Sequence, residues 1–567
     1  MNDFKKKGIY FLPLGGADEI GMNMFVYAVN GKLIVVDAGY GFLNDDFPGM
    51  DMCYASPEFL ENYREDILGL FITHGHEDHL GAIAQIWPSL QCPVYGTDFS
   101  LGLVKERLSE YKLQDMVPLI SVNKERVIRL EDFEIEFIPI AHSIPETSAL
   151  FIKTPNGNIM HATDWRFDDN KLSMVKTDFV SLERASKEGV DIFVCDSTNV
   201  MVDEPQASEE DVRENLIKII PEMQGGIVAT CFASNIMRLE SLILAARAGG
   251  RTPILAGRSL VTNVKIAKQC GYLSEYGDIH TLEEVEGITS DKALYICTGS
   301  QANYRSAMST IANDENKYIK LAAEDNVIFS SKIIPGNEDK IERLQEKILA
   351  KGVNLVTEED YLVHTSGHAC KKDLRAMYEL LNPKIVLPVH GDKKFIREHK
   401  KFAKSCGVDD VFSAQNGDIC LYDGHKIEMQ EQILAEIMGV DRGRSVSLSS
   451  ELVKNRRRIM YNCTLFISAV ISKDYKLKSL QFSSIDILEE NEWYVLHEEI
   501  MKQVKPLIEQ KLSENSNRNA VEDFIRGQIR RRVLSATDIK PVTTLHIHWE
   551  EDEEKAENKP EDTEQEQ

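Results

Sequence analysis

The sequence has no long apolar run. No stretch of its 567 residues approaches the ~20 consecutive apolar residues that cross a membrane. The apolar stretch Ile9–Leu14, which follows the lysine triplet at 5–7, is too short for the core of a signal peptide and ends at Gly15-Gly16. We therefore expect a cytoplasmic protein that does not contact a membrane.

The sequence also lacks closely spaced cysteines. Its ten cysteines are scattered along the chain, and none belongs to a Cys-x-x-Cys pair. Scattered cysteines in an intracellular chain are mostly small buried apolar residues. A metal site in this protein should therefore use histidine and carboxylate ligands rather than thiolates.

Positive charge is scarce, since 65 basic residues face 91 acidic ones and the formal net charge is −26. This balance disfavours nucleic-acid binding by bulk electrostatic attraction, although it does not exclude such a ligand. A polyanionic substrate would need a locally positive channel, or metal ions that offset the phosphate charge. Part of the charge is local, because residues 550–567 carry a net −8 and few apolar side chains.

The length suggests three or four domains. From about Ser208, strands and helices alternate as in a parallel, doubly wound sheet, and ligand-type residues like those of the first 200 positions return after about 355. The middle segment is therefore typical of an insertion into a split domain. We predict a core domain at 1–208 and 356–425, an inserted domain at 209–355, a linker at 426–450, a C-terminal domain at 451–549 and an acidic disordered tail at 550–567.

Some local elements can be predicted with their ends. Asn30-Gly31 between two apolar strands predicts a tight hairpin. In the last domain, the pattern favours strands near Arg458–Ser472 and Thr544–Trp549, and helices near Glu498–Leu512 and Ala520–Leu534. Between Ile485 and Leu496, apolar residues recur without a clear period.

Four potential metal ligands are crowded into six positions: His74, His76, Asp78 and His79. They directly follow an apolar run, and imidazole and carboxylate groups crowded at a strand end need a compensating partner, of which a metal ion is the natural one. His74 and His76 can turn toward one ion and Asp78 and His79 toward a second, while Glu77 points elsewhere. The alternative is a solvated polar loop that happens to contain histidines.

Other expected strands end in the same kind of residue. Asp37, His142, Asp164, Asp196 and His390 each follow an apolar, strand-like stretch. Taken singly, Asp37 could cap a turn, and a lone histidine such as His142 is more often structural than a ligand. Their shared position at strand ends favours a common site.

The order of these residues resembles that of the metallo-β-lactamase superfamily, and the insertion between Asp196 and His368 resembles its nucleic-acid-processing β-CASP branch. Further motifs are similar to those of the ribonuclease J family: Thr73–His79, His142–Pro145, Cys195–Asn199, Phe232–Asn235, Thr298–Gln301, Ile334–Glu338, His364–His368 and Pro388–Gly391. The resemblance implies an α/β fold: an αββα sandwich, an inserted doubly wound β-CASP domain and a small α+β C-terminal domain.

The resemblance also implies two Zn²⁺ ions per subunit, with Mn²⁺ or Mg²⁺ as possible substitutes. The expected ligands are His74, His76, His142 and Asp164 for one ion, and Asp78, His79, Asp164 and His390 for the other. A hydroxide between the two ions would attack the phosphodiester. Asp37 and Asp196 are expected to orient imidazoles, His368 to meet the scissile phosphate or protonate the leaving oxygen, and Asp78 to serve catalysis as well as ligation.

The residues expected to bind substrate match family segments that grip the RNA backbone and its 5′-phosphate. They are Ala233, Ser234, Asn235, His364, Thr365, Ser366, Gly367 and His368. Small residues let backbone N–H groups approach a phosphate. The chain departs from the family after Thr298–Gln301, where Ala302-Asn303-Tyr304-Arg305 replaces the usual Gly-Glu-Pro.

The expected function is therefore a zinc-dependent ribonuclease of RNA maturation and decay. The resemblance implies 5′-to-3′ exonuclease and internal cleavage of single-stranded RNA, a preference for a 5′-monophosphate, and a homodimer or homotetramer. One alternative is a small-molecule hydrolase of the same superfamily, acting on a thioester or lactam, which would have no use for the insertion. Another is an inactive RNA-processing scaffold, against which the complete set of ligand residues argues.

Overall fold

The computed structural model describes residues 4–168, 176–204, 207–277, 279–284, 287–334, 337–514 and 517–550. The chain forms two compact units, one of Met1–Phe42 with Asp51–Ser445 and one of Leu43–Met50 with Val446–Gln567. Within the described ranges, no helix has both the length and the apolar character needed to cross a membrane. The expected acidic tail lies, from residue 551 on, outside the described residues.

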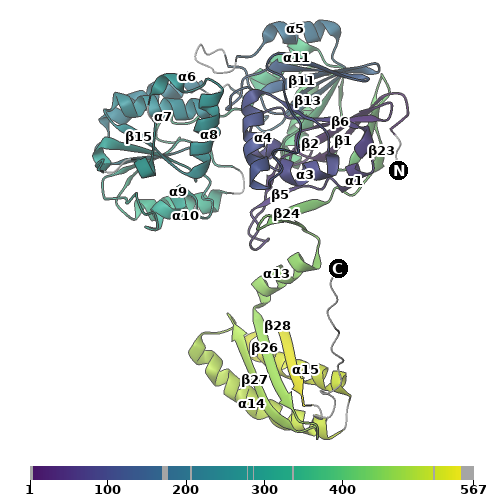
Figure 1. Cartoon of the computed structure of the whole chain (residues 1–567), viewed down its shortest axis with the longest axis vertical. Helices are drawn as coiled ribbons and strands as arrows, with labels where there is room; N and C mark the ends of the chain where they lie inside the picture. The colour runs from purple at the N-terminus through teal and green to yellow at the C-terminus, as the bar shows by residue number, and fades with distance from the viewer. Residues whose placement is uncertain are drawn as a thin grey trace, which may run out of the picture. The chain divides into compact units, whose positions relative to one another are not determined.

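The core of the first unit consists of two sheets packed face to face (Figure 1). The first has the order β23-β22-β1-β2-β3-β6-β7-β8, with bounds Ile427–Gln432, Asp418–Tyr422, Ile9–Gly15, Met24–Val29, Lys32–Val36, Ile67–Phe71, Val94–Gly96 and Leu119–Ser121. The second has the order β21-β20-β13-β12-β11-β10-β9, with bounds Asp410–Val411, Ile385–Val389, Ile192–Asp196, Gly157–Ala162, Ser148–Thr154, Phe133–Pro139 and Val127–Leu130.

Apolar side chains of both sheets form one buried core, in which Phe11 and Phe25 of the first sheet meet Phe137 and Leu150 of the second. Helices cover the outer faces. Helices α3 (Ile83–Leu90) and α4 (Asp98–Glu110) belong to the first sheet, and α5 (Phe179–Glu188), α11 (Lys371–Leu381) and α12 (Lys393–Ser405) to the second. The four layers form the expected αββα sandwich.

The hairpin between β2 and β3 is confirmed. Asn30 and Gly31 both have positive φ, 51° and 84°, and Val29 pairs with Lys32 across the turn. Two such residues form the turn type whose twist matches that of the flanking strands. The hairpin brings β3 to the centre of the sheet, where its carboxyl end lies beside that of β6.

The inserted domain is a parallel, doubly wound sheet with the order β16-β15-β17-β14-β18-β19, as expected. Its strands are His280–Thr281, Thr252–Ala256, Ala293–Cys297, Ile227–Thr230, Asn326–Phe329 and Asn354–Val356. Figure 1 shows α6 (Glu209–Ile219), α7 (Ile236–Ala248) and α8 (Arg258–Gln269) on one side of this sheet, and α9 (Ala307–Ala312) and α10 (Glu338–Leu349) on the other. Loops that follow parallel strands share one edge of a sheet, so the segments after β14, β17 and β18 lie together.

The segment 426–450 is not the expected linker. Strand β23 pairs with β22, and β24 (Ile437–Asp441) pairs with β5 (Met52–Ala55) in a small sheet with β4 (Gly41–Phe42) and β25 (Arg444–Ser447). The sequence pattern does not predict β23, because β23 is an edge strand whose residues after Ile427 are all exposed and mostly polar. Without a buried face, it shows no apolar alternation.

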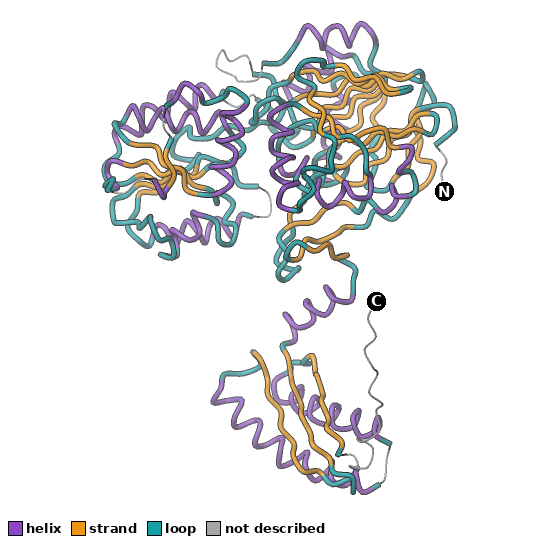
Figure 2. Tube along the Cα trace, viewed as in Figure 1, coloured by secondary structure: helices purple, strands orange, loops and turns teal. Residues whose placement is uncertain are grey.

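The second unit is the expected α+β domain. Its sheet has the order β27-β26-β28, and α14 and α15 run along it (Figure 2). The elements are α13 (Glu451–Asn462), β26 (Thr464–Ile471), β27 (Leu477–Ile485), α14 (Glu490–Ser513), α15 (Arg518–Thr537) and β28 (Val542–Trp549). The strand expected from Arg458 begins later because α13 extends to Asn462. The sequence pattern does not predict β27, which buries only Leu480 and Phe482.

Candidate metal centre

All seven residues expected as metal ligands lie together at one edge of the sandwich. His74 and His76 follow β6, and Asp78 and His79 lie in the one-turn helix α2 (Glu77–Leu80). The others, His142, Asp164 and His390, follow β10, β12 and β20. Strands far apart in the sequence therefore deliver their terminal residues to one place.

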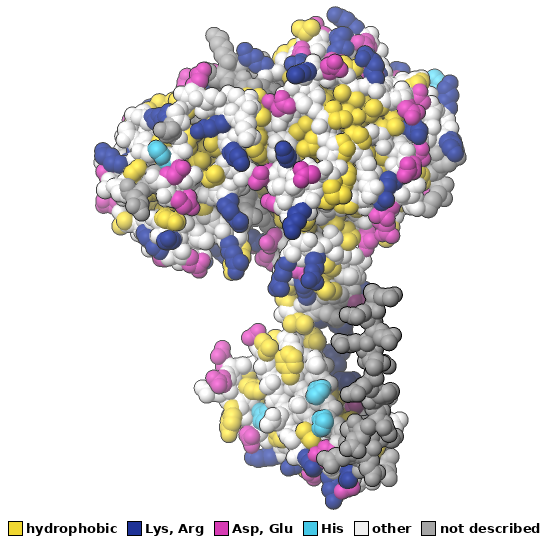
Figure 3. Space-filling model, in the orientation of Figure 1, with side chains coloured by type: hydrophobic (Ala, Val, Ile, Leu, Met, Phe, Trp, Pro, Cys, Tyr) yellow, Lys and Arg dark blue, Asp and Glu magenta, His cyan; other side chains and the backbone are white. Residues whose placement is uncertain are grey.

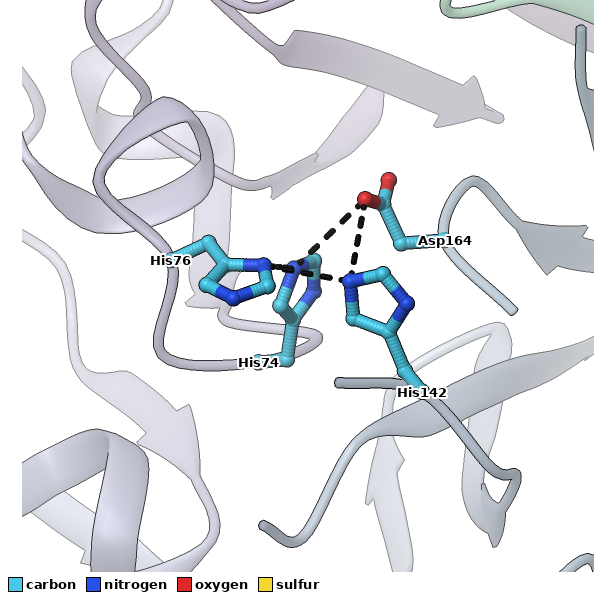
Figure 4. A group of neighbouring side chains, drawn as sticks. All are labelled: His74, His76, His142 and Asp164. Carbon is cyan, nitrogen blue, oxygen red and sulfur yellow. Dashed lines mark hydrogen bonds and ion pairs between the residues drawn. The ribbon is translucent and has the colours of Figure 1, made fainter. Parts of the chain in front are cut away.

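The first donor group consists of His74, His76, His142 and Asp164, whose ligand atoms lie within 4.8 Å of one another (Figure 4). His76 Nδ1 lies 3.1 Å from His74 Nε2 and 3.1 Å from His142 Nε2. Asp164 Oδ2 lies 3.4 Å from His142 Nε2 and 3.8 Å from His74 Nε2. Three ring nitrogens and a carboxylate oxygen thus converge on one point.

The second donor group consists of Asp78, His79 and His390. Asp78 Oδ2 lies 3.2 Å from His390 Nε2 and 3.6 Å from His79 Nε2. The other oxygen of Asp164, Oδ1, lies 3.0 Å from His79 Nε2. Asp164 therefore faces the first group with one oxygen and the second group with the other, as expected for a bridging carboxylate.

Hydrogen bonds on the far side of the rings fix which nitrogen faces the centre. Nδ1 of His79 donates to Asp37 Oδ2 at 2.7 Å, and Nδ1 of His142 donates to the Gly367 carbonyl at 2.7 Å. Nδ1 of His74 and of His390 lies 3.0 Å from a threonine hydroxyl, of Thr73 and Thr198 respectively. In each of these four rings Nε2 is therefore the nitrogen that faces the interior. Two groups of buried and half-buried nitrogen and oxygen donors in this arrangement fit zinc.

The two groups differ in charge. Burial lowers the pKa of His76 to about 4 and that of His142 to about 3, so both rings are neutral near pH 7, the form that binds a metal. Burial also opposes protonation of His79, but Asp164, Asp78 and Asp37 hold its pKa well above the usual value. Carboxylates thus favour the protonated form of the histidines in the second group, and a divalent cation bound there would take the place of these protons.

Three family models match this chain, and two of them cover the residues of this centre. A beta-lactamase superfamily domain matches residues 33–205, the beta-CASP domain of ribonuclease J matches 224–348, and a Zn-dependent metallo-hydrolase RNA specificity domain matches 352–411. Among curated proteins, ribonuclease J of Sinorhizobium meliloti is 35% identical over 415 residues, which are 72% of this chain and 74% of that protein. Ribonuclease J of Helicobacter pylori (strain B128) is 31% identical over 562 residues, 97% of this chain and 80% of that protein.

The chain belongs to the ribonuclease J family. The ribonuclease J of Mycobacterium tuberculosis (strain H37Rv) is likewise 35% identical over 416 residues, 72% of this chain and 74% of that protein. The family resemblance and the fold class expected from the sequence are confirmed. The zinc in the name of the third family model agrees with the nitrogen and oxygen donors of the centre.

Asp37 lies behind the second donor group. It is fully buried, its Oδ1 accepts from the Thr73 backbone N–H at 2.8 Å, and its Oδ2 accepts from the Thr73 hydroxyl at 2.8 Å and from His79. Its hydrogen bonds therefore hold the His79 ring and the start of the histidine motif. Glu77, which we expect outside both groups, is turned away and pairs with Arg107.

We expect Asp37→Asn to weaken zinc binding by about 10–100-fold, the usual cost of losing a partner that orients a ligand. An amide oxygen keeps one acceptor but loses the charge that holds the His79 N–H. Competition of the protein with a coloured zinc chelator measures the affinity. Asp66→Asn, which removes a half-exposed partner of Lys32, is the matched control. Equal zinc affinity in both variants would show that Asp37 has no part in the centre.

His368 and Asp196 lie at the rim of the centre. His368 Nδ1 donates to Asp196 Oδ2 at 2.8 Å and lies 3.8 Å from Asp164 Oδ2. The other oxygen of Asp196 accepts from the Thr198 backbone N–H. The imidazole is thus aligned beside both donor groups, and with Asp164 and His390 it forms a third group of possible ligands whose donor atoms lie within 4.8 Å of one another.

The expected substrate residues fall into two kinds. Ala233, Ser234, His364 and His368 are partly exposed. The side chains of Asn235, Thr365 and Ser366 are buried and engaged within the protein: Asn235 caps α7, Thr365 donates to the Ala207 carbonyl, and Ser366 Oγ accepts from Asn199. At Gly367, a Cβ would lie 2.7 Å from the His142 ring, so only glycine fits beside this ligand. The buried residues can shape a substrate site chiefly through their backbone.

Two residues that the sequence analysis does not single out support this segment. Arg166 and Arg238 are both buried and both donate to residues 363–366. A signal exists for Arg238, which stands in the apolar run Ile236-Met237-Arg238-Leu239. Arginine on the buried face of a helix is rare unless it is paired.

Proposed function

We propose that this member of the ribonuclease J family is a zinc-dependent ribonuclease that removes nucleotides from the 5′ end of single-stranded RNA and also cuts it internally. The observation that carries the proposal is Asp164, whose two oxygens face two separate donor groups. Two divalent ions held in this way supply a nucleophile at neutral pH and positive charge for an in-line phosphoryl displacement. Family membership supports RNA as the substrate class.

The protein's own residues would position the RNA. The phosphate next to the metals would lie against His368, whose alignment by Asp196 suits it to protonate the leaving 3′-oxygen. Small residues of the segment 364–368 let backbone groups approach the chain of phosphates. A 5′-terminal phosphate held there would lie a fixed distance from the metals, which favours removal of nucleotides from the end.

The strand-end loops of the inserted sheet offer a path for the rest of the strand. Tyr304 is 82% exposed, and the Arg305 guanidinium lies 5.2 Å from its ring centre. Gln301 ties this loop to the neighbouring one by donating to the Lys332 carbonyl and accepting from the Ile334 N–H. Aromatic and arginine side chains stack on unpaired bases. The residues that replace Gly-Glu-Pro in this chain are therefore proposed as a base contact.

Bulk charge does not account for RNA binding. On the face shown in Figure 3, lysine and arginine side chains are scattered among acidic ones rather than gathered into one field. In a chain with a net charge of −26, the phosphate charge must be offset locally, by metal ions and by a few placed cations. Metal ions bound by the two donor groups would supply this local positive charge.

A 5′-monophosphate RNA should be degraded from its end at least about tenfold faster than the same RNA with a 5′-triphosphate. The pocket is proposed to match one phosphate, and unpaired additional charge costs a few kcal/mol. The measurement follows the release of mononucleotides from 5′-labelled single-stranded RNA. Equal rates on both RNAs would contradict the 5′-phosphate pocket. Hydrolysis of thioesters or lactams without cleavage of any RNA would favour the small-molecule alternative.

A further inference from the structure

The segment 363–368, which carries the proposed substrate residues, is neither helix nor strand. Its carbonyls are instead held by side chains from elsewhere in the fold. Gly367 O accepts from His142 Nδ1, and His368 O accepts from Asn199 Nδ2 at 3.1 Å. These bonds fix the end of the segment that lies next to the metal centre.

Arg238 of the inserted domain holds the other end. Its side chain is fully buried, and it binds both oxygens of Glu209 at 2.9 and 3.1 Å. The remaining guanidinium nitrogen donates to the carbonyl of Val363 at 2.8 Å and to the carbonyl and hydroxyl of Ser330 at 2.9 and 2.8 Å. Ser330 Oγ itself donates to the Val363 carbonyl at 2.6 Å. Arg238 therefore joins α6, α7 and β18 to the start of the segment.

Arg166 of the core holds the middle. It lies two residues after Asp164, and its Nη1 donates to the Ser366 carbonyl at 2.7 Å and to the Thr365 hydroxyl at 3.1 Å. Its Nη2 donates to Asp168 at 2.9 Å. The core domain and the inserted domain thus each contribute one arginine that hydrogen-bonds to the segment 363–368.

A buried ion pair such as Arg238 with Glu209 contributes little net stability, because desolvation of both charges offsets their attraction. The geometry gives the pair a different use. A planar guanidinium can bind a carboxylate with two nitrogens and still present a third donor in a fixed direction. Here that third donor points at the segment on which the substrate residues lie.

We propose that Arg166 and Arg238 form a clamp that positions the segment 363–368, and that Arg238 thereby sets the spacing between the RNA 5′ end and the metals. The inference rests on the proposed function, which supplies the RNA. Arg238 is a positioning residue, because it acts through Val363, the backbone that follows, and the His364 ring, whose Nδ1 lies 3.4 Å from Arg238 Nη1. Weakening the contacts of Arg238 shifts the segment but leaves both donor groups in place.

The test compares Arg238→Lys with Arg213→Lys. Lysine keeps the charge but cannot bind Glu209 with two nitrogens and reach Val363 as well. Arg213 also joins α6 to α7, through Glu240 and Ser241, but does not contact the segment. For Arg238→Lys, kcat/KM on 5′-monophosphate RNA should fall by up to about 10²-fold, the scale of a misplacement near 1 Å. The loss should lie mainly in KM, and di- and trinucleotides should accompany the mononucleotide product.

Two further readouts separate positioning from loss of structure. Zinc content and hydrolysis of bis-p-nitrophenyl phosphate, which has no strand to be positioned, should stay within about twofold of the unchanged protein in both lysine variants. Ser330→Ala removes one bond to Val363 with little change in volume. It should show the same longer products to a smaller degree, and it decides the question if Arg238→Lys does not fold.

Each other outcome has a distinct meaning. If Arg238→Lys yields the same products and KM as Arg213→Lys, the clamp is overturned. It is equally overturned if Arg238→Lys loses zinc and phosphodiester hydrolysis in proportion to RNA cleavage, because the residue is then only structural. If the unchanged protein hydrolyses bis-p-nitrophenyl phosphate but no RNA, the proposed function fails rather than the clamp.

Discussion

Replacing Asp164 with asparagine should reduce RNA cleavage by more than about 10³-fold, the largest loss that we expect from one substitution. Asp164 is the carboxylate that faces both donor groups, at 3.4 Å from His142 and 3.0 Å from His79. Asparagine keeps the shape but removes the charge and one oxygen donor. A two-metal centre that loses its bridge loses several kcal/mol of transition-state stabilisation, and about 1.4 kcal/mol corresponds to a factor of ten.

The measurement is the initial rate on 5′-monophosphate RNA at a fixed zinc concentration, together with the thermal unfolding midpoint. Glu77→Gln is the matched control. Glu77 lies within the same histidine motif, but its carboxylate pairs with Arg107 instead of facing a donor group. We expect it to keep most of the activity. More than a tenth of the normal rate in Asp164→Asn, or an equal loss in Glu77→Gln, would contradict the assignment.

His368→Ala should give the second-largest loss, about 10²–10⁴-fold on RNA, the usual contribution of a general acid. Asp196 Oδ2 accepts a hydrogen bond from His368 Nδ1 at 2.8 Å, which leaves Nε2 to serve the leaving oxygen. The 3′-oxygen of RNA is a poor leaving group and needs a proton. The p-nitrophenolate of bis-p-nitrophenyl phosphate does not.

The same variant therefore contains its own control. On the activated phosphodiester, His368→Ala should lose less than about tenfold, while its zinc content stays unchanged. Asp196→Asn should also lose more activity on RNA than on the activated phosphodiester, but its loss should be smaller than that of His368→Ala. The His368 ring is still present in this variant, but the Asp196 carboxylate no longer orients it. An equal loss on both substrates would show that His368 acts on the metals or on binding rather than on the leaving group.

Part of the candidate metal centre could be predicted from the sequence because several of its residues follow an apolar strand, whereas the full division of ligands between two ions rests on the family resemblance. His74, His142, Asp164 and His390 could be grouped by their shared place after an apolar strand, and the strands that carry them, from both sheets, end at the same edge of the sandwich. The hairpin at Asn30-Gly31 and the alternating elements of the insertion are equally local signals. In both cases, residues that are close together in the sequence determine the turn type or the apolar period.

Other features depend on contacts between distant residues and could not be predicted. Nothing near Arg238 indicates that it reaches Val363, which lies 125 positions further along the chain. The glycine at 367 is explained only by the ring of His142 beside it. Strands β23 and β27 escape notice because each has an exposed face and little apolar period, so that their pairing partners, rather than their own residues, make them strands.

The structure also refines the expected substrate residues. Asn235 and Thr365 match the family motifs, but their side chains hold α7 and the Ala207 carbonyl in place. Their contribution to RNA binding is therefore expected to be indirect, through the backbone that they fix. The partly exposed Ser234, His364 and His368 remain available for direct contact.

The central claim is that two metal ions, one in each donor group, are both required for RNA cleavage. Its most direct test is a zinc titration of chelator-stripped protein, with the initial rate on 5′-monophosphate RNA and bound zinc measured in the same samples. We predict no cleavage without metal and a rate that rises until two zinc ions are bound per chain. Full activity in the stripped protein, or at one bound ion per chain, would contradict the account.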